Sequence, residues 1–416
     1  MFTGEVTGML ASRWSGRWSG PLLIGFALHS PAQQTKPAAP APEQTAQPAP
    51  NATVRLIPRS EEERQHTSEA SHQIILNVLV TDASGKPVIS LSQDDFTILD
   101  NGQPQKIISF RPLTTNTKGQ PLHVILLLDA VNNSARNFAA ERKAVEKFLA
   151  QSRGSLPWPV AIAHLSDFGA GVSAPSSDAN ALLIYLKNLP GEVHQSAPAG
   201  DQPNHELFPG LRGPGTLPTA QPRTQKVDLQ WQDQNQRFLL SIAALNKIAV
   251  QQEDVPGRVI MIWLGPGWPL LSGPGFLPDT AEIKSSFFDH IADLSTEIRE
   301  AQMTLDTVAT PDLLHNDGLS TGYYSPFLAA VTASSQANAG NLALPVLATQ
   351  SGGQVLDDSK DITAGIAACL ADAESWYEFS FESTPSAQPD EYHALQVKVN
   401  KPGVNTRTNT AYYAEP

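Results

Sequence analysis

The sequence predicts an α/β protein with a Rossmann-like, open and mostly parallel central sheet, accompanied by an accessory β-sandwich. Three observations predict this class. Continuous apolar runs from residue 123 onward have the composition of strands buried on both faces. Segments with the 3.6-residue period of an amphipathic helix lie between these runs. Period-two segments near both ends are typical of strands with one buried face, and neither set is large enough to be stable alone.

The front of the chain is expected to be an export signal followed by a tether. Arginines precede the short apolar run PLLIGFAL (21–28), and small residues follow at the spacing of a cleavage site. We therefore expect a signal peptide over 1–32, with translation starting at Met1 or Met9, and an exported protein that is periplasmic or extracellular. The alternative is a disordered tail. Residues 33–70 are rich in Pro, Ala and Gln, which predicts an extended linker.

Residues 71–115 are predicted to form a small β module. The run QIILNVLVTD alternates apolar and polar residues from Ile74, and the run DDFTILDNGQPQKIISF indicates two further strands. Asn101 and Gly102 supply a turn with positive φ between these two strands.

Residues 120–376 alternate between strand and helix patterns. Buried strands are expected at HVILLLD (123–129), WPVAIAHLSD (158–167), RVIMIWLG (258–265), MTLDTVAT (303–310) and GQVLD (353–357). Helices are expected over 178–189, 232–250, 281–301 and 361–376. Ligands bind such sheets beyond the carboxyl ends of the strands, where the order of the strands reverses.

One insertion and one terminal module complete the organisation. Residues 190–230 are rich in Pro and Gly and lack periodicity, so they form either a binding element or a disordered loop. Residues 377–416 return to period two and contain three further strands. We expect these strands to pair with 71–115 in one sandwich, because each set then gains the core that it lacks alone.

Charge and cysteine content exclude several classes of protein. The formal net charge is -13 with no basic cluster, which argues against a nucleic-acid partner because binding phosphates requires a basic surface. No segment is apolar for long enough to span a membrane. The single cysteine, Cys369, lies on the apolar face of a predicted helix, so we interpret it as a buried structural thiol.

Residues 74–416 resemble the acidobacterial von Willebrand factor type A-related (VWFA-related) secreted protein family. The resemblance rests on NVLVTDASGKPVISLSQDDFTILDNGQPQKIISF, on LLLDAVN and on the closing YHALQVKVNKPGVNTRTNTAYYA. It implies a Rossmann-like A domain joined to a β-sandwich, an exported protein and no established activity.

The metal site that this resemblance implies is incomplete here. Metal-binding A domains carry a D-x-S-x-S loop after the first strand, a threonine from a later loop and an aspartate after the fourth strand. Asp129 keeps the first position, but the serine positions hold Val131 and Asn133, and GPGWP (265–269) brings no carboxylate. Mg²⁺ requires hard oxygen ligands. We therefore expect no cofactor and no functional metal, with Asp129 and Asn133 as weak candidates, and we expect Asp129 to cap the following turn.

The candidate partner-binding residues lie at or just after the carboxyl ends of the predicted strands. They are Asp129, Asn132, Asn133, Ser166, Asp167 and Trp268. Trp268 lies in a Gly/Pro loop, where an exposed tryptophan would anchor a partner and a buried one would only pack locally.

Two functions from different classes remain. The first is a non-enzymatic module that binds a protein partner through its strand-end loops, with a degenerate metal-ion-dependent adhesion site. The second is a secreted hydrolase of unknown substrate that uses strand-end loop residues. The pattern G-x-S-x-G occurs at GLSTG (318–322), but it lies inside the predicted loop 315–340 and not directly after a strand, where a nucleophile elbow lies. In GPGWPLLSG the third glycine of a dinucleotide-binding motif is replaced by Leu270. His164 and Ser166 are close in sequence, but residues two apart on a strand have little freedom to form a base–nucleophile pair. We therefore assign no catalytic residue.

Overall fold

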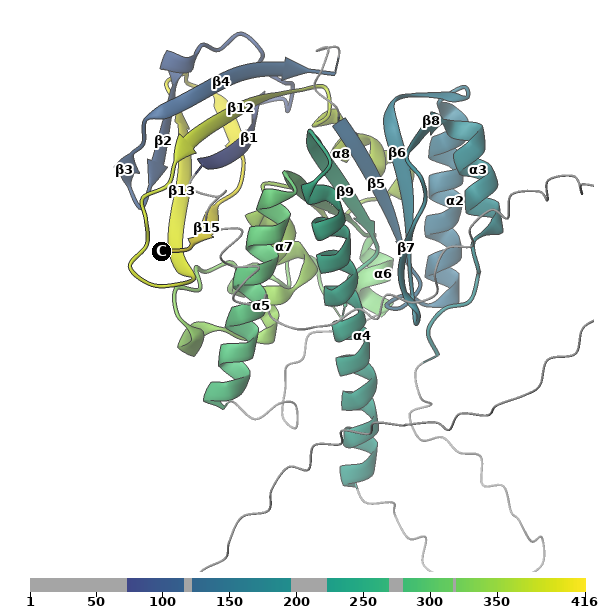
Figure 1. Ribbon diagram of the computed structural model, residues 1–416. Helices are drawn as coiled ribbons and strands as arrows, with labels where there is room; N and C mark the ends of the chain where they lie inside the picture. The colour runs from purple at the N-terminus through teal and green to yellow at the C-terminus, as the bar shows by residue number, and fades with distance from the viewer. Residues whose placement is uncertain (1–72, 116–121, 196–222, 269–279, 317–318) are drawn as a thin grey trace, which may run out of the picture. The chain divides into compact units, whose positions relative to one another are not determined.

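The computed structural model describes residues 73–115, 122–195, 223–268, 280–316 and 319–416 (Figure 1). The expected export signal and linker lie outside the described residues, as does most of the predicted insertion.

A seven-stranded sheet forms the centre of the α/β region among the described residues, in the order β11-β10-β9-β5-β6-β7, with β8 paired to β6 (Figure 1). The strands are β5 (Leu122–Asp129), β6 (Ser155–Ser166), β7 (Gly169–Val172), β8 (Ser176–Asp178), β9 (Arg258–Leu264), β10 (Met303–Val308) and β11 (Val355–Leu356). Strands β5, β6, β9, β10 and β11 run parallel, whereas β7 and β8 are antiparallel to β6. The predicted open, mostly parallel sheet is confirmed.

Helices cover both faces of this sheet. One face packs against α2 (Ala135–Gln151), α3 (Ala179–Asn188) and α8 (Ile362–Ala371). The other packs against α4 (Arg223–Glu253), α5 (Ala281–Glu300) and α7 (Leu344–Gln350). Successive residues of β5 enter these two cores alternately, which explains why this strand is apolar at nearly every position.

Short helices complete the α/β region. They are α6 (Pro311–Asn316), η2 (Ser325–Phe327), η3 (Ser334–Gln336) and η4 (Ala339–Leu342). Side-chain caps fix the starts of several longer helices. Ser134 caps α2, Asp178 caps α3 and Asp361 caps α8, each by accepting a backbone N–H from the first turn.

The strand order places the reversal of direction between β5 and β9. The chain leaves β5 into α2 on one face of the sheet, and it leaves β9 into α5 on the opposite face. The carboxyl ends of β5 and β9 therefore flank the position where open α/β sheets bind ligands.

Two four-stranded antiparallel sheets form the accessory sandwich within the described residues, in the orders β14-β1-β12-β4 and β15-β13-β2-β3. Strands from the front of the chain are β1 (Gln73–Asp82), β2 (Phe96–Asp100), β3 (Gln103–Pro104) and β4 (Ile107–Thr114). Strands from its end are β12 (Ser375–Glu382), β13 (Glu391–Val399), β14 (Val404–Arg407) and β15 (Ala411–Ala414). The short helix η1 (Gln93–Asp95) precedes β2.

Each sheet of the sandwich combines both ends of the sequence. β12 lies between β1 and β4, β13 pairs with β2, and residues from all these strands share one core. The predicted accessory sandwich built from N- and C-terminal strands is confirmed. Figure 1 shows the purple-blue and yellow strands side by side in it.

Several local details differ from the sequence-based expectation. The C-terminal segment forms four strands, β12 to β15, where three were expected, and α4 begins at Arg223 instead of 232. Asn101 and Gly102 do have positive φ, but their turn leads into the short strand β3, after which β4 joins the other sheet. The last helix ends at Ala371 because β12 already begins at Ser375. The antiparallel strands β7 and β8 were not predicted, because both are short and lie in Gly-, Ser- and Pro-containing sequence.

Candidate functional site

Asp129, the last residue of β5, is completely buried, and four N–H groups point at its carboxylate. The backbone N–H groups of Val131 and Asn132 donate to Oδ1 at 3.0 and 2.9 Å. The Asn132 side-chain Nδ2 and the Trp263 indole Nε1 donate to Oδ2 at 2.8 and 3.0 Å. Each carboxylate oxygen thus accepts two bonds, and the expected capping of the turn by Asp129 is present.

The partners of Asp129 come from two neighbouring strands. Trp263 belongs to β9 and is paired with Leu127 of β5, so the sheet register brings its indole to the end of β5. Burial raises the pKa of Asp129, whereas the four hydrogen bonds act in the opposite direction. Because all four partners are donors, the ionised carboxylate is the form that satisfies them.

The neighbouring amides extend this network. Nδ2 of Asn132 also donates to Ser241 Oγ of α4 at 2.8 Å. Nδ2 of Asn133 donates to the Asp129 carbonyl at 2.9 Å and to Glu141 Oε2 at 3.1 Å. Glu141 is a fully buried residue of α2. The loop after β5 is therefore bonded to helices on both faces of the sheet.

Large apolar side chains pack around Trp263, which is part of this network. Val131, Trp263 and Trp268 are all buried in the same core, and the two indoles meet edge to face with their centroids 5.3 Å apart. Trp268 Nε1 donates to the Leu342 carbonyl at 3.0 Å. Trp268 is only 2 % exposed, so of the two roles considered for it the structure shows local packing.

The backbone of the GPGWP loop explains the burial of Trp268. Gly265 has φ +120° and Gly267 has φ +79°, values that side-chain-bearing residues rarely adopt. A Cβ on Gly265 would lie 2.8 Å from Asn133 Nδ2, and one on Gly267 would lie 2.8 Å from the Leu344 Cβ. These glycines let the chain turn back over the sheet and direct Trp268 inward.

The residues present do not fit a Mg²⁺ site. Both oxygens of Asp129 face N–H donors, and Val131 has no oxygen to offer. The Oδ1 atoms of Asn132 and Asn133 are buried without a hydrogen-bond partner, but they are neutral amides, and Oε2 of the neighbouring Glu141 carboxylate already accepts from Asn133 Nδ2. Over the described ranges, no group of three or more His, Cys, Asp or Glu side chains is arranged to hold a metal.

The turn between β6 and β7 forms the outer rim of this edge. Ser166 Oγ accepts the N–H of Phe168 at 3.3 Å and donates to the Gly169 carbonyl at 3.2 Å. Phe168 is fully exposed at the tip of the turn. Asp167 is partly exposed and lies 2.6 Å from Nδ1 of His194.

His194 connects the rim to two other segments. Its Nε2 lies 2.9 Å from Oδ1 of Asp233 on α4, and its backbone N–H donates to the Ala130 carbonyl at 2.8 Å. Burial alone lowers the pKa of His194, but the hydrogen bonds and charges of Asp233 and Asp167 outweigh it, so the pKa lies above its usual value.

The six candidate residues divide into two groups. Asp129, Asn132, Asn133 and Trp268 are buried at the switch point and leave little surface for a partner, whereas Ser166 and Asp167 lie in the accessible rim. His164 packs against Phe138 at a centroid distance of 5.7 Å, and Ser166 bonds within its own turn.

Sequence reasoning missed several residues of this edge. Glu141 could have been found, because a glutamate on the apolar stripe formed by Phe138 and Val145 is unusual. His194 and Asp233 could not, because they and Asp167 come from three segments with no common spacing.

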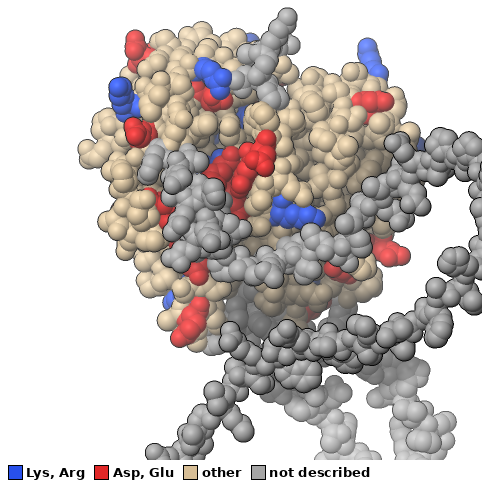
Figure 2. All heavy atoms as spheres, in the orientation of Figure 1, with Lys and Arg blue, Asp and Glu red and all other residues tan. Residues whose placement is uncertain are grey.

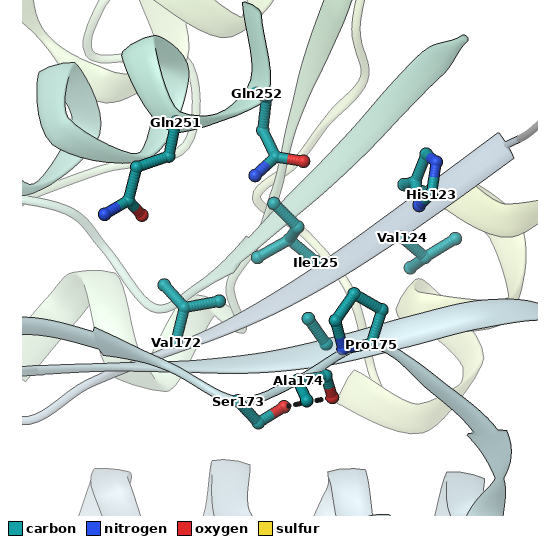
Figure 3. Close-up of a pocket in the computed structure, with 10 residues that line it drawn as sticks. His123, Val124, Ile125, Val172, Ser173, Ala174, Pro175, Gln251 and Gln252 are labelled. Carbon is teal, nitrogen blue, oxygen red and sulfur yellow. Dashed lines mark hydrogen bonds between the residues drawn. The ribbon is translucent and has the colours of Figure 1, made fainter. Parts of the chain in front are cut away.

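A separate pocket of about 260 Å³ lies away from this site, near the amino end of β5. Figure 3 shows Ile125 near its middle, with Gln251 and Gln252 of α4 on one side and Val172 and Pro175 on the other. Among the described residues that line it, His123 alone has an acidic or basic side chain.

Comparison with known proteins yields structural likenesses only. No protein-family model matches the chain, and no curated protein matches its sequence. An aerotolerance-related membrane protein from Bacteroides fragilis has a TM-score of 0.29 and 12% identity, covering 60% of this chain and 98% of that one. The conserved hypothetical protein BatB from Bacteroides thetaiotaomicron has a TM-score of 0.28 and 9% identity, covering 61% and 98%. The SpRpn10 VWA domain has a TM-score of 0.27 and 11% identity, covering 60% and 94%.

Two surface properties bear on possible partners. In the part of the chain that the structure describes, no helix has both the length and the apolar character to cross a membrane. On the face drawn in Figure 2, the Lys and Arg side chains stand apart from one another, whereas acidic side chains gather near the middle.

Proposed function

We propose that this chain is an exported, non-enzymatic module that binds a protein partner at the carboxyl edge of its central sheet without a bound metal. The observation that carries the proposal is the fully exposed Phe168 at the rim of an otherwise closed edge. The A-type domain would present the rim, and the sandwich would support it.

The turn that carries Phe168 is suited to anchoring a partner. Its backbone is fixed by the two hydrogen bonds of Ser166 and by Gly169 at φ +92°, so binding need not order the loop. Burying a phenylalanine side chain contributes about 1.5–3 kcal/mol. Buried aromatic anchors commonly dominate the energetics of protein interfaces. Phe168 thus takes the anchoring role that was one of the two alternatives for Trp268.

The crevice behind the rim supports binding without a metal. Asp129 already accepts four hydrogen bonds from the protein, one of them from Trp263, and Val131 and Trp268 are buried in the same core as Trp263. A divalent ion would have to displace these donors to reach the carboxylate. The net charge of -13 further favours a protein partner over nucleic acid.

Site-specific photo-crosslinking in the native host envelope fraction tests the proposal. A benzophenone amino acid replaces Phe168 in the full chain, and the same probe replaces Ile184 of α3 as a control that is also exposed and apolar. We expect one specific protein adduct from position 168, unchanged by EDTA, and none from position 184. An identical adduct pattern at both positions, no adduct at 168, or loss of the adduct in EDTA would overturn the proposal.

A further inference from the structure

His194 lies between two carboxylates, one at each ring nitrogen. Nδ1 is 2.6 Å from Asp167 Oδ1, and Nε2 is 2.9 Å from Asp233 Oδ1. The three residues come from the β6–β7 turn, the segment after α3 and helix α4. Three parts of the fold that are distant in sequence therefore meet at one imidazole.

The chemistry of imidazole makes this arrangement depend on protonation. A neutral ring has one N–H and one lone pair, so it can donate to only one carboxylate. The lone pair would then face an ionised oxygen at hydrogen-bond distance, which is repulsive. Both contacts are favourable only when both nitrogens carry a proton and the ring is a cation.

We propose that Asp167, His194 and Asp233 form a protonation-dependent clamp that holds α4 at Asp233 and the segment 189–195 against the rim of the sheet. The clamp is closed when His194 is an imidazolium and loosens when the ring loses its proton. This inference goes beyond the proposed function and requires no partner.

The surroundings of the ring support a titration of His194 itself. The acidic groups that face it are Asp167 from the β6–β7 turn and Asp233 from α4. From α2, Arg142 donates to the carbonyls of Leu186 and Lys187 in the last turn of α3, just before the segment that carries His194. The loop after β5 contributes the backbone carbonyl of Ala130, which is uncharged.

The direction of the pH effect follows from the raised pKa of His194. The folded protein holds the second ring proton of His194 more tightly than the unfolded chain does. Histidines in an unfolded chain have a pKa of about 6.5. The stabilisation is complete below that pH and is lost as the pH rises through the higher pKa of the folded state. Loosening also leaves Asp167 and Asp233 facing each other without a cation between them.

The test combines histidine NMR with hydrogen exchange on the full chain. In protein carrying ¹³C-labelled histidine, the resonance that His194→Gln removes is followed from pH 5 to 9. We expect its midpoint to lie above that of a free histidine, and Asp233→Asn to lower it. A midpoint at or below about 6.5, or no shift in Asp233→Asn, would overturn the proposal.

Hydrogen exchange, corrected for intrinsic rates, provides the structural readout. We expect amides within 189–195 and 232–240 to lose protection at least fivefold between pH 6 and 8.5 in the wild type, but to be equally unprotected at both pH values in His194→Gln. His123→Gln, at the opposite end of β5, is the matched control and should behave as wild type. Equal protection of the wild type at both pH values would contradict the clamp.

Discussion

Replacement of Asp129 tests whether its hydrogen bonds hold the crevice closed. In Asp129→Ala, the backbone N–H groups of Val131 and Asn132 and the indole N–H of Trp263 lose their acceptor, whereas Asn132 Nδ2 keeps Ser241. An unsatisfied buried donor costs about 1–3 kcal/mol, so three such donors cost at least about 3 kcal/mol.

Asp129→Asn gives a subtler version of the same perturbation. Whichever way the amide is oriented, its NH₂ group faces two of the four N–H donors, so we expect a loss of at least about 2 kcal/mol. Asp254→Ala removes an exposed carboxylate with the same charge change, and we expect it to alter stability by no more than about 0.5 kcal/mol.

Equilibrium urea unfolding monitored by tryptophan fluorescence, with EDTA throughout, measures these changes. EDTA ensures that loss of a metal cannot account for any difference. Destabilisation of both Asp129 variants but not of Asp254→Ala is the expected result. If Asp129→Asn unfolds at the wild-type urea concentration in EDTA, the four donors do not stabilise the crevice and the reasoning is refuted.

Three further predictions concern other parts of the molecule. Trp268→Ala should lose about 3–5 kcal/mol in urea unfolding because it leaves a large cavity, and wild-type stability would show that the indole is not core. Phe168→Ala should change stability by less than about 0.5 kcal/mol, and a larger loss would mean that this side chain packs. Burial, aided by the charge of Asp372, raises the pKa of Asp306 to about 7, so its contribution to stability is complete below about pH 4 and is lost as the pH rises through 7. Asp306→Asn should remove that pH dependence from the urea midpoints, and an unchanged profile would contradict it.

The sequence predicted the structure correctly in two situations. One is a local pattern of apolar residues, and the other is a set of strands that has too little core to be stable alone. The apolar run ending at Asp129 predicted the central strand, and Val131 revealed a missing oxygen ligand. The period-two segments at both ends predicted the sandwich, because neither could be stable without the other.

The sequence failed where contacts depend on strand order or on backbone turns. The indole of Trp263 reaches Asp129 only because β9 is the neighbour of β5. The pattern left both an exposed and a buried Trp268 open, because it cannot show that Gly265 and Gly267 turn the chain inward. His194 lies in a stretch without periodicity, so nothing local indicated its two carboxylate partners.

The measurement that bears most directly on the central claim is the melting temperature with and without divalent metal. The full chain is melted in EDTA and in millimolar Mg²⁺ or Mn²⁺, beside Asp129→Asn. A ligand that binds only the native state must stabilise it. Because the Asp129 carboxylate already accepts four protein hydrogen bonds, we predict the same melting temperature in all metal conditions. A rise of several degrees in the wild type that Asp129→Asn abolishes would contradict the account.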